Sequence, residues 1–256
     1  MGHGGGLLLH IYGMALLLLQ ILWHVTARYG LLLLFATFAC QGQLPSPTQT
    51  PLPVARSILE DSGNAMALLD SFGFDLTHRN GGMPISDDLV VKEVSGNVVK
   101  PDKIKISWDG AFAGFYVRSQ VISLDKQAYM TDPITGRWSS IPAELNPLGF
   151  FQPDVGIASI MSDVAEASVA GLETLGEATV YRIEGRLPTS SLKPLLGVVA
   201  TDLMVDTVAW IGSTDMYLYQ VVFSGMVVPG DAIDIKRTIK LFNFNQPVVI
   251  EAPRLE

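Results

Sequence analysis

The chain has 256 residues and a formal net charge of -8, which is enough length for one large domain or two small ones. It has no cluster of basic residues, so nucleic acid is not expected as a partner, because phosphate binding needs a positive surface. The single cysteine excludes an internal disulfide, and the fold must therefore be held by its buried core.

Histidine usage argues against catalysis. His3, His10 and His24 lie in the first part of the chain, and only His78 remains in the rest. A Ser-His-Asp or Cys-His apparatus would have to use His78, which lies in an apparent strand where a solvent-facing side chain is expected. No His, Cys and carboxylate residues have the spacing of metal ligands. The sequence therefore predicts that the protein is not an enzyme and uses no metal or other cofactor.

The stretch from Arg28 to Cys40 has the composition of a secretory leader. It combines one positive charge, an apolar run and a small residue, Ala39, directly before the cysteine. The segment that follows is too polar and too rich in proline to pack, so it predicts a flexible tether. The expected organisation is a leader at 1–40, a tether at 41–52 and a globular body at 53–256.

Cys40 has the position of the lipid-bearing first residue of a mature bacterial lipoprotein. Thr37 stands where such signals usually have leucine, so an uncleaved membrane anchor and an inert cysteine stay open as alternatives. A second apolar stretch, residues 5–23, is explained either by a start of translation at Met14 or by a membrane segment. All of these interpretations place the body outside the cytoplasm.

The first half of the body predicts one helix followed by many strands. Residues 53–71 carry an apolar stripe at helical spacing, and Gly63 and Asn64 weaken its middle. Strands are expected at 74–78, 89–96, 103–108, 112–124 and 126–130. A turn at 132–136 then makes a hairpin in which Tyr129 and Trp138 come from adjoining strands.

The second half mixes helices and strands. An apolar loop at 145–151 leads to Asp154, which can cap a helix from Val155 to about Leu172. A strand at 178–187 and a short helix opened by Thr189 follow, and strands are expected at 203–211, 216–224 and 233–245.

Neighbouring strands with few helices indicate an α+β fold built on one antiparallel sheet. An open sheet of nine to eleven strands tends to curl. A curled sheet with helices on its concave side can leave an apolar space that suits a small molecule or a lipid. Two packed layers with a solid core use the same residues, and composition alone favours the solid core.

Three stretches of the body resemble a known family: the hairpin at 129–138, the strand at 208–211 and the ending at 242–253. With their order across residues 52–253 and with Cys40, they make the chain similar to the mycobacterial LppX/LprA/LprF/LprG lipoprotein family, which is related in fold to the lipoprotein carrier LolA. The resemblance implies a single curved antiparallel sheet, a half-open barrel covered by a few helices on its concave side, that holds the acyl chains of glycolipids or other complex lipids.

The candidate lining of such a space comes from three apolar groups, and an ordinary place in the core stays open for every member. They are the sheet residues Phe112 and Phe115, the loop residues Phe150 and Phe151, and the helical stripe Ile157, Ile160, Met161 and Val164. Burial of an acyl chain contributes about 0.8 kcal/mol per methylene, so a long chain needs no hydrogen bonds to be held.

Sequence and resemblance together imply a monomeric lipoprotein of the cell membrane, displayed on its extracytoplasmic side. Acyl chains such as palmitate on Cys40, or the uncleaved leader, would anchor it, and it would bind lipid or glycolipid and carry it to or across the cell envelope. The alternative is a non-catalytic sensor or interaction domain of the same fold that regulates a membrane partner. Lipid that co-purifies with the body would favour the carrier.

Overall fold

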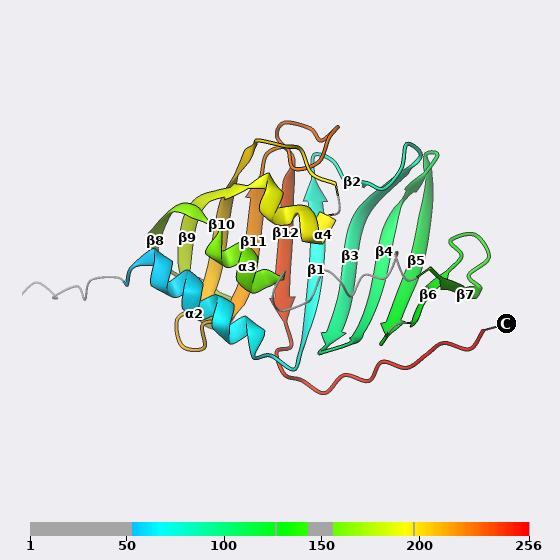
Figure 1. Ribbon diagram of the computed structural model, residues 1–256, viewed down its shortest axis with the longest axis horizontal. Helices are drawn as coiled ribbons and strands as arrows, with labels where there is room; N and C mark the ends of the chain where they lie inside the picture. Colours follow the sequence, from blue (N-terminus) through cyan, green and yellow to red (C-terminus); the bar gives the residue numbers. More distant parts are fainter. Residues whose placement is uncertain (1–52, 126, 143–155, 197, 256) are drawn as a thin grey trace, which may run out of the picture. The chain divides into compact units, whose positions relative to one another are not determined.

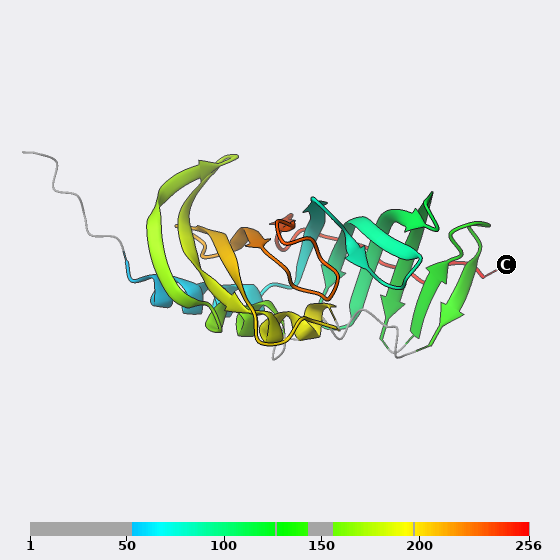
Figure 2. The same ribbon diagram turned by 90° about the horizontal axis from the view of Figure 1, so that it is seen from above.

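The computed structural model describes residues 53–125, 127–142, 156–196 and 198–255. Leu52–Glu256 forms one compact unit with its own core, the condition under which a domain can fold alone. Its main element is a curved sheet of twelve strands (Figures 1 and 2). The strands are β1 (Ser71–Arg79), β2 (Met83–Pro84), β3 (Leu89–Val99), β4 (Lys103–Phe112), β5 (Phe115–Leu124), β6 (Gln127–Thr131), β7 (Trp138–Ile141), β8 (Ala165–Leu175), β9 (Ala178–Pro188), β10 (Met204–Gly212), β11 (Leu218–Ser224) and β12 (Lys236–Phe242).

The sheet is entirely antiparallel and open. Neighbouring strands follow the order β7-β6-β5-β4-β3-β1-β12-β11-β10-β9-β8, and β2 pairs with β3. β1 pairs on one side with β3 and on the other with β12, so it joins a meander of early strands to a meander of late ones. The single curved antiparallel sheet with few helices that was expected from sequence and resemblance is confirmed.

Helices pack on one face of the late half of this sheet (Figure 1). They are α2 (Ala55–Ala67), α3 (Ile157–Ser162), the 3-10 turn η3 (Thr189–Leu192) and α4 (Lys193–Leu196). α2 buries Ile58, Leu59 and Met66 from the predicted stripe, whereas Val54 and Leu68 at its two ends are exposed. No helix among the described residues is both long and apolar enough to cross a membrane.

The long helix expected at 155–172 is wrong beyond its first two turns. α3 ends at Ser162, and β8 begins at Ala165 and pairs with β9. The apolar stripe breaks after Val164, where small and polar residues alternate instead, and Gly171 adopts φ 159 in a β-bulge. Pairing with β9 satisfies the backbone of this segment, and Leu172 is left 52% exposed.

The core lies between the helices and the sheet. Phe72 and Phe74 of β1 and Leu241 of β12 pack there against α2 and α3. Phe74 lies over Gly96 of β3, where an added Cβ would come within 2.8 Å of the ring. The glycine therefore gives the ring of Phe74 the room that it occupies.

Candidate functional site

A small apolar cavity lies beneath α3. Its volume is about 90 Å³, below the roughly 300–1,000 Å³ of ordinary ligand sites. Thr207 is the only polar residue of its lining, and its hydroxyl donates a hydrogen bond to Val205 O. The lining residues are Phe72, Phe74, Leu76, Ile157, Ile160, Met161, Val164, Thr207, Ala209, Leu218, Val221, Phe223, Ile239 and Leu241.

A larger apolar groove runs over the early half of the sheet. Its volume is about 550 Å³, which is within the usual range for a small-molecule site. Strands β2 to β7 and the β6–β7 turn form its walls. The lining residues are Met83, Ile85, Leu89, Val91, Val94, Ile106, Trp108, Phe112, Val117, Val121, Met130, Pro133, Ile134 and Ile141.

The cavity and the groove adjoin on one face of the sheet. Leu76 of β1 lines the cavity, Val94 of β3 lines the groove, and these two residues stand directly opposite each other in the ladder. Residues opposite each other on antiparallel strands present their side chains on the same face. The two apolar spaces therefore form neighbouring parts of one surface, which no polar strand separates.

Of the eight candidate lining residues, five line the cavity or the groove. All four residues of the helical stripe, Ile157, Ile160, Met161 and Val164, line the cavity, although Val164 lies after the end of α3. Phe112 lines the groove. Phe115 is 77% exposed and lines neither space. Phe150 and Phe151 lie outside the described residues. Contact of any of these residues with lipid stays a prediction.

Most residues of the groove wall were not among the candidate lining residues from the sequence, although the apolar alternation of their strands was visible there. The alternation of residues 103–108 predicts an inward apolar set, and Ile106 and Trp108 of that set line the groove. The alternation says which residues share a face but not which face carries an open space. That depends on the helices, which cover the late strands.

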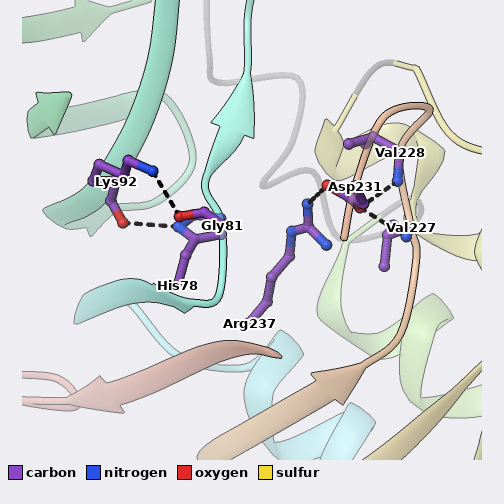
Figure 3. Close-up of polar contacts among 7 residues, drawn as sticks. All are labelled: His78, Gly81, Lys92, Val227, Val228, Asp231 and Arg237. Atoms are coloured by element: carbon purple, nitrogen blue, oxygen red, sulfur yellow. Dashed lines mark hydrogen bonds and ion pairs between the residues drawn. The ribbon is translucent and has the colours of Figure 1, made fainter. Parts of the chain in front are cut away.

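A buried polar cluster lies at one end of β1 and β12 (Figure 3). Nη2 of Arg237 is 2.6 Å from Oδ1 of Asp231, and both side chains are almost fully buried. Oδ2 of Asp231 accepts hydrogen bonds from the backbone N–H groups of Val227, at 2.9 Å, and Val228, at 2.8 Å. Two backbone donors and one guanidinium thus hold the Asp231 carboxylate.

His78 stands opposite Arg237 in the β1–β12 ladder, and its side chain is half-buried instead of facing solvent as expected. Its Nδ1 lies 2.8 Å from Lys92 O, and because that oxygen can only accept, Nδ1 carries the proton. Its Nε2 is buried. Burial lowers the pKa of His78, the hydrogen bond to Lys92 O partly opposes this, and the charge of Arg237 lowers the pKa further.

Comparison with known proteins places this architecture in a family. The model of the family described as LppX_LprAFG lipoprotein matches residues 54–250. The chain belongs to this lipoprotein family. The match spans most of the body, from the start of α2 to beyond β12, and so includes both apolar spaces.

The individual proteins and solved structures that match have low sequence identity to this chain. The lipoarabinomannan carrier protein LprG of Mycobacterium tuberculosis strain H37Rv and that of Mycobacterium bovis BCG are each 24% identical over 172 residues, which is 66% of this chain and 71% of the relative. The crystal structure of LprF from Mycobacterium bovis matches with a TM-score of 0.62 at 20% identity and covers 80% of this chain and 99% of LprF. LppX from Mycobacterium tuberculosis matches with a TM-score of 0.54 at 16% identity, over 77% of this chain and 98% of LppX. These solved structures show the same fold.

No group of three or more His, Cys, Asp or Glu among the described residues is arranged to hold a metal ion. What the described site offers is apolar surface with one buried polar cluster at its edge. Apolar surface of this kind is typical of sites that bury hydrocarbon.

Proposed function

We propose that the protein binds the acyl chains of a lipid or glycolipid on the helix-covered face of its sheet and carries that lipid at the cell envelope. The observation that carries this proposal is the pair of adjoining apolar spaces, in which the groove alone has a volume of about 550 Å³. Each buried methylene contributes about 0.8 kcal/mol, so ten methylenes supply about 8 kcal/mol before the costs of association.

The family supports the same proposal. Two relatives are named as carriers of lipoarabinomannan, a glycolipid, and the family model is described as a lipoprotein family. We propose that Cys40 carries the lipid anchor and that 41–52 is the tether, so that the body works on the outer side of the membrane. No catalytic role is proposed, because a lipid carrier needs only reversible burial of the acyl chain.

Native mass spectrometry of the compact unit Leu52–Glu256, purified without detergent, tests lipid binding directly. The expected result is a protein mass increased by that of a co-purifying lipid, which solvent extraction removes. A body that emerges empty and takes up no added lipid would contradict the carrier and leave the interaction domain as the explanation.

Val94→Phe should block the site and reduce lipid uptake. Val94 stands where the cavity adjoins the groove, and it is only half-buried, so a larger side chain extends into the groove with little strain. We expect about a tenfold loss of lipid affinity, measured by displacement of a fluorescent fatty acid.

Ser95→Phe is the matched control for this variant. Ser95 is the next residue on β3, it is exposed, and its side chain points to the other face of the sheet. It adds the same ring without touching the groove, so affinity should stay at the wild-type value. Equal losses in both variants would mean that the ring disturbs β3 and not the site.

A further inference from the structure

Arg237 and His78 lie next to the lining of the apolar cavity, on the same face of the sheet. Leu76 and Ile239 both line the cavity and stand opposite each other on β1 and β12, and the next pair in the same phase is His78 with Arg237. On the other side, Arg237 stands opposite Phe223 of β11, which also lines the cavity. His78 and Arg237 therefore present their side chains on the same face as the cavity, at its edge.

His78 is also linked to a strand of the groove wall. The ring of His78 is hydrogen-bonded to Lys92 O of β3, and Val91, the residue before Lys92, lines the groove and is buried. The hydrogen bond therefore joins His78 to the segment of β3 that carries the groove wall at Val91.

Several polar atoms of this pair have no partner. Nε and Nη1 of Arg237 and Nε2 of His78 are buried and form no hydrogen bond within the structure described. Arg237 is only 2% exposed, and its ion pair with Asp231 uses Nη2 alone. A buried donor without a partner costs about 1–3 kcal/mol, and more when it is charged, so such atoms usually mark a position that a ligand or water fills.

The free atoms have the chemistry of an oxyanion site. The N–H groups on Nε and Nη1 of a guanidinium lie on different edges of the group, so each donates to a separate acceptor, such as an oxygen of an ionised head group or a water. Nε2 of His78 accepts a hydrogen bond from a protonated head group when the ring is neutral, and donates one to an ionised head group when the ring is charged. Asp231 is held by Val227 and Val228, so it keeps the guanidinium in place from the side away from His78 (Figure 3).

We propose that Arg237 and His78 bind the carboxylate or phosphate head group of an amphiphile whose chain lies in the adjoining groove. This assignment rests on the proposed lipid-binding function and adds the class of head group to it. The site selects an acidic lipid over a neutral one of the same chain length, because an ionised head group forms a charge-assisted hydrogen bond with Arg237.

Two ligands with the same chain test the assignment on the compact unit Leu52–Glu256. Decanoic acid and 1-decanol are titrated separately by calorimetry near neutral pH, with acetate as a third ligand. We expect decanoate to bind about tenfold more tightly than decanol, because a charge-assisted pair is worth more than the hydrogen bond of an alcohol. Acetate should not bind measurably, because it lacks the chain that the groove holds.

The variant Asp231→Asn/Arg237→Met removes the free donors of Arg237 without changing the net charge, and it leaves no unpaired buried charge that would prevent folding. In this variant the preference for decanoate should disappear, while the affinity for decanol stays within about twofold of wild type. Lys236→Met is the matched control, because it removes a cation from the neighbouring, exposed position of β12, and it should retain the preference.

A second measurement needs no variant. The ring proton signals of His78, the only histidine in residues 53–256, should shift on addition of decanoate and not on addition of decanol.

Three results would each overturn the head-group site while leaving chain binding intact. They are equal affinity for the two ligands in the wild type, a preference that survives in the double variant, and ring proton signals of His78 that do not shift. Tight binding of acetate would assign the site to a free small anion instead. Binding of neither decanoate nor decanol would overturn the proposed function, and this inference with it.

Discussion

Arg237 and Asp231 are the only charged residues buried within the described chain. The sequence contains a signal for Arg237, because it falls in the apolar phase of its strand, between Ile235 and Ile239, while its charged neighbours take the other phase. Such a residue either pairs inside the protein or disrupts the strand. Nothing in the sequence identifies Asp231 as its partner, since Asp231 lies in a loop whose path only the fold defines.

Asp231→Ala should destabilise the protein strongly. It leaves the Arg237 guanidinium buried without a counter-ion, and removal of one partner of a buried pair costs about 3–5 kcal/mol. The free energy of unfolding, from urea denaturation of the body, should fall by this amount. The double variant Asp231→Asn/Arg237→Met should lose much less, because no charge stays buried, and an equally large loss there would contradict this account.

His78 should make stability depend on pH. Burial lowers its pKa in the folded protein below the ordinary value of 6.5, although its hydrogen bond to Lys92 O and the charge of Asp231 oppose the shift, and Arg237 and Lys92 add to it. On acidification the unfolded chain therefore binds this proton first, so stability is lost as pH falls through about 6.5 and the loss ends at the lower folded pKa.

Urea midpoints of the body at about pH 7.5, 6.5 and 5.5 measure this dependence. His78→Gln keeps a donor for Lys92 O but does not titrate, so its midpoints should fall less than those of the wild type over this range. Parallel curves for the two proteins would show that His78 is not responsible.

At the scale of elements, the alternating patterns predicted most strands well, because a strand with one buried face has a period of two. The hairpin at 129–138 is an example, since Thr131 pairs with Trp138 and the turn between them has Asp132 accepting hydrogen bonds from the N–H groups of Ile134 and Thr135. The segment after Ser162 was mispredicted, because small residues such as Ala165 and Ala167 fit a helix as well as an edge strand, and only pairing with β9 decides between them.

α3 owes its position to α2. Nη1 of Arg56 donates to Ser162 O at 2.7 Å and Nη2 donates to Val164 O at 2.8 Å, so one side chain binds the end of the helix that covers the cavity. α3 has only six residues, and a helix of that length is not stable without tertiary contacts. The cover of the cavity therefore depends on a contact between two elements that lie far apart in sequence.

Arg56→Ala should loosen this cover. Loss of two partly exposed charge-assisted hydrogen bonds is expected to cost about 1–2 kcal/mol. Hydrogen exchange of the α3 amides should become faster while that of the central strands β1 and β12 stays the same. Glu60→Ala, an exposed change on the same helix, should alter neither, and unchanged exchange of α3 in Arg56→Ala would contradict the role of this residue.

At the scale of the whole domain, one half of the apolar face of the sheet is covered by helices and the other half is open. The helices cover the late strands and leave a cavity of about 90 Å³, whereas the early strands carry a groove of about 550 Å³. A solid core and an open apolar space, which the sequence left as alternatives, are therefore both present on one sheet. The acyl chains of the lipid are proposed to bind in the open part.

Replacement of Cys40 tests whether a lipid on this residue anchors the protein to the membrane. Cys40→Ser should abolish incorporation of labelled palmitate and release the body from the membrane fraction, because a protein without acyl chains has no such anchor. Thr37→Leu, which restores the usual residue of the lipoprotein signal, should increase incorporation. A Cys40→Ser chain that stays in the membrane at its full size would identify the leader itself as the anchor.

The sequence by itself determined the class of fold, the helix at 53–71, most strands and the apolar character of their inner faces. It could do so because these features follow from local periodicity and from the geometry of helices and strands. The tertiary structure alone decided that β1 joins two meanders, that the open space lies over the early strands, and that His78 stands opposite Arg237 on neighbouring strands. These are consequences of which distant strands pair and of which face the helices cover, and neither has a local signal in the chain.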